Sequence, residues 1–427
     1  MKNLIKKIAI GFAVFVLPLQ PLVAQNMKCV LKGEVIDRPE SRYLVLLKDR
    51  EDFRITDGVQ IPIQDGTFEY VLNCDFEEMY QFIFLDEMEK SSWRPIKFFS
   101  ENGTVNFKLY PQNEWLKNKI EGGALNTDYY ALEKNAHEII VPLYEELSAK
   151  RELLHKEGKM TSPEAQEIYE KLKTAKNDEL NGLYRELEKL RNERRDLTPE
   201  GLALQDEDKR TFLIYRDMKW KYAQENPTIA GYEIVMDATW SAAHSSFIKQ
   251  DIEPIIEIYN TVYAKKYPNH PYTEQIKNLI NSVTSIKVGG KYIDFEAIDS
   301  QNNNIKLSEQ IQGKIALIHL WASWCGPCRR NGMSMIPVYE AYKDKGFTVV
   351  GIARENTSSL KAMRNAIERD KYPWLNLVEL NDKEQIWTKY GRGNAGGGEF
   401  LVDGNGIILA IDPTAEEVEK ILAERLK

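Results

Sequence analysis

The pattern of apolar and polar positions changes twice along the chain, and each part predicts a different kind of structure. From Met27 to about Pro111, short runs of alternating apolar and polar residues are separated by turn dipeptides such as Asp-Gly and Asn-Gly. Such alternation, with turns at this spacing, is typical of antiparallel strands. We therefore predict an antiparallel β domain over residues 25–115, a small sandwich or barrel. The strand-like runs are CVLKGEVID, YLVLLK, GTFEYVLN, YQFIFLD, IKFF and VNFKLY.

The second part, residues 116–284, has a helical period. Its apolar residues recur at intervals of three and four, with Lys, Arg and Glu between them. Ser162-Pro163-Glu164 predicts a helix start, because it combines a capping hydroxyl, a proline that needs no amide partner and an acidic residue at the positive helix end. We therefore expect an α-helical middle region. The recurring positions are Leu132, Ala136, Ile139, Leu143 and Leu147, and then Leu180, Leu183, Leu187 and Leu190.

Within this region, residues 130–196 alternate acidic and basic side chains and predict a charged helical hairpin. Regular alternation of charge mainly supports helix faces that are exposed to solvent. This favours a solvated helical pair that leans on its own domain. An arm that forms a homodimer through the helical region is the alternative.

After Lys287, strands alternate with helices. IALIHLWA and FTVVGIA are expected to be buried strands, and FLVDGNGIILAI a hairpin. Helices are predicted over Arg329–Asp344, Ser358–Arg369 and Glu416–Leu426. This order predicts an α/β domain with a mixed sheet over residues 285–427.

The first residues, MKNLIKKIAIGFAVFVLPLQPLVAQ, have the pattern of a secretory signal peptide. Three lysines precede an apolar core from Ile8 to Leu19. An uncleaved membrane anchor is the alternative, but a core of about 12 residues is shorter than the roughly 20 that a spanning helix needs. We expect residues 1–24 to be removed after Ala24 and the mature protein to be periplasmic.

Composition and charge limit the partners of the chain. The sequence is 43% hydrophobic and 29% charged, as in a globular protein, and its formal net charge is -8. Residues 1–24 contain three lysines and no acidic residue, so the remainder carries -11. An acidic chain of this kind disfavours nucleic acid and anionic membrane surfaces as partners.

Two of the four cysteines are isolated in strand-like runs of the β domain. In an exported protein, disulfides are chemically permitted. Cys29 and Cys74 therefore form either a structural cross-strand disulfide or two buried thiols, and the sequence leaves both open. No small-residue box precedes Cys29, so we do not expect lipid attachment there.

The other two cysteines form a CxxC motif in WASWCGPCRR, between a predicted strand and a predicted helix. This position puts Cys325 at a helix N-terminus, where free amide groups and the helix dipole stabilise a thiolate. Cys328 lies about one turn on, within reach to resolve a mixed disulfide. We therefore expect Cys325 to attack and Cys328 to resolve. The residues expected to flank the pair are Trp324, Gly326 and Pro327.

Other functions of the CxxC pair fit the sequence less well. A structural zinc site needs four ligands, and no second CxxC or histidine pair lies nearby, so we expect no metal and no bound cofactor. A purely structural disulfide that closes so short a loop removes little entropy from the unfolded chain.

A second glycine-rich motif, GRGNAG at residues 391–396, matches GxGxxG but follows a helix-like segment and precedes a strand, which argues against a dinucleotide site. The glycines instead predict a loop whose backbone approaches a substrate chain closely. The residues expected to do so are Gly396, Gly397 and Gly398.

The motif WASWCGPCR resembles the active site of thioredoxin-like proteins of the TlpA and ResA type. DFEAID, LSEQIQGKIALIHL, KGFTVVGIA and EFLVDGNG follow the order of that family from Val288 to the C-terminus. A β-rich N-terminal domain of unknown function, a helical middle and a thioredoxin domain also resemble proteins common in Bacteroidetes. The resemblance implies a thioredoxin-like fold and an exported thiol-disulfide oxidoreductase. It also implies protein disulfide substrates, a reducing centre and a membrane-embedded electron donor.

Four positions depart from that family. Gly397 stands where the family has a cis-proline facing the cysteines. Asn331 replaces a frequent Glu, and Met333 replaces the usual helix proline. His319 stands where thioredoxin has a buried acid. It would either transfer the proton when Cys328 attacks or be a core histidine bonded to backbone, and the sequence leaves both open.

Two rival functions remain at this stage. The β and helical regions make up more than half of the mature chain, as in an extracytoplasmic binding or scaffold protein whose thioredoxin domain is vestigial or acts on thiols only incidentally. A thiol peroxidase on the same fold ranks last. Resemblance to peroxidases would require a motif with Thr and Cys and without a Trp before the Cys, and this motif is missing.

Overall fold

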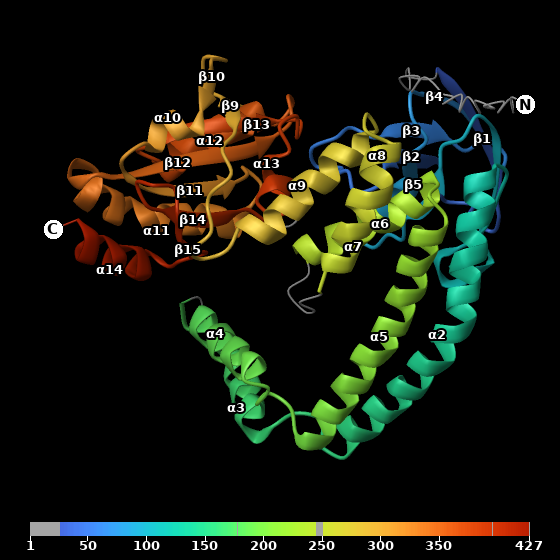
Figure 1. Cartoon of the computed structure of the whole chain (residues 1–427), viewed down its shortest axis with the longest axis horizontal. Coiled ribbons are helices and arrows are strands. Elements are labelled where there is room, and N and C mark those ends of the chain that lie inside the picture. Colours follow the sequence, from blue (N-terminus) through green and yellow to red (C-terminus); the bar gives the residue numbers. More distant parts are fainter. Residues whose placement is uncertain (1–25, 177, 245–250, 395, 427) are drawn as a thin grey trace, which may run out of the picture.

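The structure, a computed structural model, describes residues 26–176, 178–244, 251–394 and 396–426. The predicted signal peptide lies outside these ranges. In the described part of the chain, no helix combines the length and the apolar character needed to cross a membrane. Figure 1 shows a β-rich domain, a helical region and an α/β domain in this order along the chain, which confirms the predicted fold class.

The β-rich domain consists of two four-stranded sheets, ordered β4-β1-β7-β8 and β3-β2-β5-β6. Apolar side chains of both sheets, among them Leu31, Leu46, Phe82 and Phe107, share one core. The prediction of a wholly antiparallel domain is wrong in one place, because β1 pairs with β7 in parallel. The whole second sheet lies between these two strands in sequence, so the chain is long enough to return in the same direction. The elements are β1 (Met27–Val35), β2 (Tyr43–Lys48), β3 (Val59–Pro62), β4 (Thr67–Cys74), β5 (Met79–Phe84), α1 (Leu85–Glu89), β6 (Ile96–Phe99), β7 (Gly103–Leu109), η1 (Gln112–Lys117) and β8 (Lys119–Glu121).

The helical region begins with a long antiparallel pair, α2 and α5, that projects from the molecule, with α3 and α4 at its tip (Figure 1). The prediction of one hairpin over 130–196 is therefore wrong in its pairing: α2 packs on α5, and α3 packs on α4. The predicted helix start is confirmed, because α3 begins at Pro163 and the Ser162 side chain accepts a hydrogen bond from the Ala165 amide. The elements are α2 (Ala124–Lys156), α3 (Pro163–Leu172), α4 (Asp178–Asn192), α5 (Pro199–Glu225), α6 (Ile229–His244), α7 (Glu253–Ile258), the π-helical turn η2 (Tyr259–Tyr263), α8 (Ala264–Lys266) and α9 (Pro271–Ser285).

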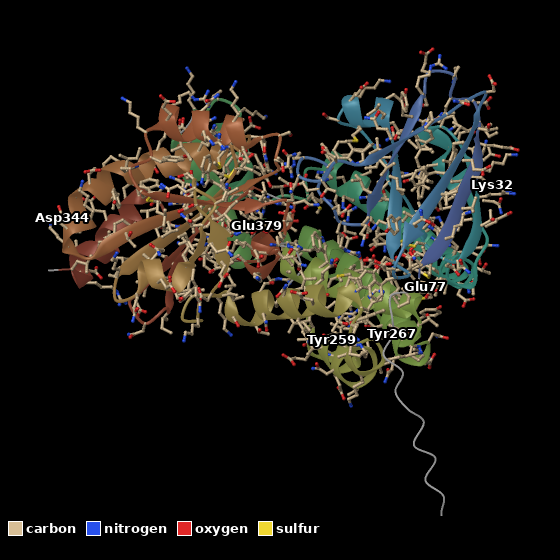
Figure 2. All side chains as sticks on the ribbon, turned by 90° about the horizontal axis from the view of Figure 1, so that it is seen from above. Lys32, Glu77, Tyr259, Tyr267, Asp344 and Glu379 are labelled. Atoms are coloured by element: carbon tan, nitrogen blue, oxygen red, sulfur yellow. A yellow bond between two sulfur atoms is a disulfide. The ribbon has the colours of Figure 1, made fainter. Side chains whose placement is uncertain are left out.

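The β-rich domain and the helical region share a core. Met79 and Phe99 pack among the buried residues of α6 and α9. The Met79 amide donates a hydrogen bond to the Tyr272 hydroxyl at 2.8 Å. Figure 2 shows Glu77 and Tyr267 on the same boundary. The two parts are therefore packed as one body.

The C-terminal domain has a seven-stranded mixed sheet, ordered β10-β9-β13-β12-β11-β14-β15. Helices α11, α12 and α14 pack on one face, and α10 and α13 on the other. The elements are β9 (Glu296–Ile298), β10 (Asn304–Lys306), α10 (Leu307–Ile311), β11 (Ile315–Trp321), α11 (Gly326–Tyr342), η3 (Lys343–Lys345), β12 (Phe347–Glu355), α12 (Leu360–Asp370), β13 (Leu375–Leu380), α13 (Ile386–Lys389), β14 (Gly398–Val402), β15 (Ile408–Ile411) and α14 (Ala415–Arg425). Helix α11 begins at Gly326, ahead of the predicted Arg329, because Cys325 caps it.

Candidate active site

The CxxC pair lies where the central strand β11 passes into α11. Every residue of β11 is buried, and the strand ends at Trp321. Cys325 is the N-cap of α11, and its Sγ accepts a hydrogen bond from the Cys328 amide at 3.3 Å. The two cysteines form a disulfide. A helix N-terminus stabilises negative charge, so this position favours a thiolate at Cys325 once the pair is reduced.

The loop before β14 covers the disulfide. Cys325 and Cys328 are only 5% and 8% exposed. The Gly397 amide donates a hydrogen bond to the Cys328 Sγ at 3.1 Å. A Cβ on Gly396 would lie 3.4 Å from the Cys325 Sγ and 3.6 Å from the Cys328 Sγ. Of the three glycines predicted to flank a substrate, these two contact the sulfur atoms.

Two features of the structure favour glycine at position 397. A Cβ there would lie 1.6 Å from the Leu320 carbonyl oxygen, so no side chain fits without a backbone shift. Proline would also remove the amide that bonds to Cys328, because proline has no N–H. The departure from the family's proline thus gives the buried sulfur a hydrogen-bond donor.

A buried carboxylate holds the turn that carries the CxxC motif. Glu355, at the end of β12, is fully buried. It accepts hydrogen bonds from the Ser323 amide at 2.6 Å and from the Ser323 hydroxyl at 3.1 Å. No sequence pattern indicated this role of Glu355, because Ser323 and Glu355 are 32 positions apart and meet only when β11 and β12 pair.

His319 faces Glu399 across the antiparallel pair of β11 and β14, and both are buried. Burial lowers the pKa of His319 to about 4 and raises the pKa of Glu399 to about 8. The His319 Nδ1 lies 3.7 Å from the Glu399 Oε1, but at pH 7 neither group carries its full charge, so the contact is not an ion pair. Neither nitrogen of His319 has a hydrogen-bond partner among the described residues, so it is not the backbone-bonded histidine of the alternative prediction.

Glu399 is a titratable group that the sequence analysis missed. It lies two residues beyond Gly397, which contacts Cys328, and it accepts a hydrogen bond from the Asn331 side chain at 3.3 Å. A carboxyl group that titrates near pH 8 can hold or release a proton near neutral pH. Proton transfer through His319 stays a prediction. Glu399 is the better candidate, because its pKa of about 8 lies closer to neutral pH than the pKa of about 4 of His319.

We expect Glu399→Gln to reduce the pH dependence of stability above pH 6.5. The unfolded carboxyl titrates near about 4.3, so between this pH and about 8 the folded state keeps a proton that the unfolded state has lost. The free energy of unfolding of the wild type therefore falls as the pH rises, by about 2 kcal/mol from this group between pH 6.5 and 9. The measurement is urea unfolding at both pH values with the disulfide kept oxidised.

The matched control is Glu379→Gln, because burial also raises the pKa of Glu379 to about 8. Figure 2 labels this residue in the C-terminal domain. Glu379 lies on β13. Each single variant should remove only the contribution of its own carboxyl group to the pH dependence of the free energy of unfolding. The double variant should remove both contributions. His319 titrates below this window. An unchanged slope in Glu399→Gln would show that the carboxyl is not protonated in the folded state.

The β-rich domain reaches this site through the connection between β2 and β3, which extends in blue toward α13 in Figure 1. The Arg54 Nη2 donates a hydrogen bond to the Asn394 carbonyl oxygen at 2.6 Å, and the Asn356 side chain donates to the Arg54 carbonyl oxygen at 3.1 Å. The Arg54 guanidinium also lies over the Trp324 ring, 4.0 Å from its centroid. Trp324 is 36% exposed, so the indole predicted to flank the cysteine pair is itself partly covered.

A buried ion pair fixes the same connection. Asp52 and Arg354 are both 3% exposed and come within 3.1 Å. Arg354 also pairs with Asp382. A buried pair of this kind requires both partners, because loss of one leaves a buried charge. The contact therefore links the β-rich domain to the thioredoxin-like domain at the side of the CxxC turn.

The isolated cysteines are not bonded. Cys29 and Cys74 are free thiols, the first buried and the second half-buried, so of the two alternatives that the sequence left open the disulfide is not present. On the paired strands β1 and β4, Cys29 lies opposite Leu72 rather than opposite Cys74. Burial raises the pKa of Cys29 to about 11, which makes it a poor nucleophile.

The structure also bears on metal and nucleotide binding. Across the described ranges, no group of three or more His, Cys, Asp or Glu side chains is placed to hold a metal ion. The GRGNAG stretch lies between α13 and β14 and so does not open a helix. It therefore lacks the strand-to-helix setting that dinucleotide binding requires.

A mixed sheet whose buried central strand leads into a CxxC helix defines a thioredoxin-like thiol-disulfide oxidoreductase domain. Residues 288–411 match the AhpC/TSA family, and residues 29–129 match a domain of unknown function (DUF4369). The chain thus joins a DUF4369 domain to a ResA-like oxidoreductase domain, which confirms the resemblance found in the sequence.

Several relatives are similar to the C-terminal third of the chain. The thiol-disulfide oxidoreductase ResA of Bacillus thuringiensis is 26% identical over 144 residues, which are 33% of this chain and 73% of that protein. ResA of Geobacillus kaustophilus is 25% identical over 150 residues, which are 34% of this chain and 82% of that protein. The thioredoxin domain of a thiol-disulfide oxidoreductase from Bacteroides vulgatus is 26% identical, covers 34% of this chain and 100% of that structure, and gives a TM-score of 0.30.

Proposed function

We propose that this chain is an exported protein-disulfide reductase. The observation that supports the proposal is the position of Cys325, which caps α11 and forms a disulfide with Cys328. The leader-like pattern of residues 1–24 supports export to the periplasm.

The reaction runs from the reduced pair. The Cys325 thiolate attacks one sulfur of a substrate disulfide, forms a mixed disulfide and releases the first substrate thiol. The Cys328 thiolate then attacks the Cys325 sulfur and releases the second substrate thiol. Two electrons pass to the substrate, and the enzyme is left with the Cys325–Cys328 disulfide present in the structure.

The pair must then be reduced again. The donor we propose is a membrane-embedded reductase that supplies two electrons through its own dithiol, and no bound cofactor is needed. Protein disulfides are the substrates, and nucleic acid is not a partner. Dimerisation through the helical region remains a proposal, which the solution mass of the purified chain tests.

The test is a redox titration of the mature protein in thiol buffers, with alkylation and mass mapping of each cysteine. We expect a reversible two-electron transition at Cys325 and Cys328 near the thioredoxin range of roughly -270 mV. The buried Cys29 is the internal control and should not titrate with the pair. If the pair stays unreactive, the result favours the alternative function, a binding or scaffold protein, over the reductase.

A further inference from the structure

Two guanidinium groups lie against the two residues next to Cys325 in sequence, Trp324 and Gly326. Arg54 lies over the ring of Trp324, the residue before Cys325. The Arg330 Nη1 lies 3.6 Å from the position that a Cβ would occupy on Gly326, the residue after Cys325. A polypeptide that brings a sulfur atom to Cys325 therefore comes close to both cations.

Both guanidinium groups have N–H donors without a hydrogen-bond partner among the described residues. The Arg54 Nε and Nη2 bond to Asp52, whereas its Nη1 has no partner within the described ranges. Arg330 is exposed and forms no ion pair with any residue that the structure describes. A ligand at this place thus finds free guanidinium N–H groups on Arg54 and on Arg330.

The neighbouring arginines Arg329 and Arg392 are paired with carboxylates. Arg329 pairs with Asp370 at 2.6 Å, and Arg392 pairs with Asp412 at 2.9 Å. Glu399 is buried and does not face a ligand. Arg54 itself pairs with Asp52 at 2.7 Å, so Arg330 is the cation that lacks a carboxylate partner here among the described residues, and Arg54 offers its free Nη1.

We propose that Arg54 and Arg330 recognise an acidic side chain next to the reacting cysteine of the substrate. The inference rests on the proposed function and adds its substrate class: polypeptide disulfides with an Asp or Glu beside the cysteine. Arg54 comes from the DUF4369 domain, so that domain takes part in the choice of substrate. A guanidinium suits this role, because its planar N–H groups match a carboxylate.

The test compares two synthetic peptide disulfides that differ only in Glu or Gln beside the cysteine. An ion pair that is open to solvent is worth up to about a fivefold preference, and salt screens it. We expect the wild type to reduce the Glu peptide with about fivefold higher kcat/KM at low salt and with equal kcat/KM in 1 M salt. Arg54→Ala and Arg330→Ala should each lower the preference to about twofold or less.

Two further variants separate charge from folding. Arg54→Lys keeps the positive charge and should retain most of the preference. Arg425→Ala removes an exposed arginine from α14, beside the far end of α11, and should leave the preference unchanged. Because Arg330 is exposed, its variant tests the inference even if Arg54→Ala disturbs the domain contact.

Equal rates for both peptides with the wild type, or a full preference in both alanine variants, would overturn this inference alone. Failure of the wild type to reduce either peptide would instead remove the proposed function, and this inference with it.

Discussion

Replacement of Cys325 by serine is expected to abolish the reduction of substrate disulfides, with a loss on the order of a thousandfold or more. Cys325 caps α11 with its Sγ, and a serine hydroxyl can cap the same helix. The fold should therefore persist while the nucleophile is lost, because a hydroxyl at a helix N-terminus is not ionised at neutral pH. The measurement is turnover of a peptide disulfide with excess dithiol, together with far-UV circular dichroism.

Two control variants make this experiment specific. Cys328→Ser keeps the attacking thiol but not the resolving one, so it should accumulate a mixed disulfide that mass spectrometry detects. Cys29→Ser removes a free, buried thiol of the β-rich domain and should leave turnover unchanged. Wild-type turnover in Cys325→Ser would contradict the assigned roles, because the reduction would then not depend on the Cys325 thiol.

Gly397→Ala is expected to lower the free energy of unfolding by roughly 3 kcal/mol, a large effect for one added methyl group. The new Cβ would lie 1.6 Å from the Leu320 carbonyl oxygen. Backbone atoms cannot move aside as a flexible side chain can, so β11 or β14 must shift. The shift would also break the hydrogen bond from the Gly397 amide to the Cys328 Sγ. Urea unfolding followed by tryptophan fluorescence measures the loss.

Gly396→Ala is the matched control on the adjacent residue. Its Cβ would meet only the two sulfur atoms, at 3.4 and 3.6 Å, which is ordinary van der Waals contact. Stability should change by less than about 0.5 kcal/mol, while access to Cys325 should decrease. Equal stability of the two variants would mean that the loop adapts at Gly397, and that the amide contact with Cys328 does not require glycine.

The reactive residues were visible in the sequence because their chemistry is local. A CxxC motif between an apolar strand pattern and a helix pattern gives the cap and the one-turn spacing directly. The same holds for the start of α3, where Ser162 and Pro163 are adjacent in sequence. The apolar pattern alone placed the start of α11 too late, at Arg329, because this pattern marks the buried face of a helix and not its cap. The CxxC motif placed Cys325 at the helix N-terminus, as the structure has it.

Errors arose where long-range pairing decides the structure. Strand β13 was not predicted, and the partner of α2 was taken to be the next helices along the chain rather than α5. The parallel pairing of β1 with β7 was missed for the same reason. Alternation and period describe one element at a time, and they do not say which distant element covers its apolar face.

The sequence by itself determined the class of this protein and its nucleophile, since capping, spacing and the buried strand are encoded within a few residues of Cys325. Only the tertiary structure decided what surrounds the sulfur atoms. Glu399 reaches Asn331 over 68 positions, and Arg54 reaches Asn394 over 340. The carboxyl becomes protonated because burial removes it from water, and that depends on strands that the chain brings together only on folding.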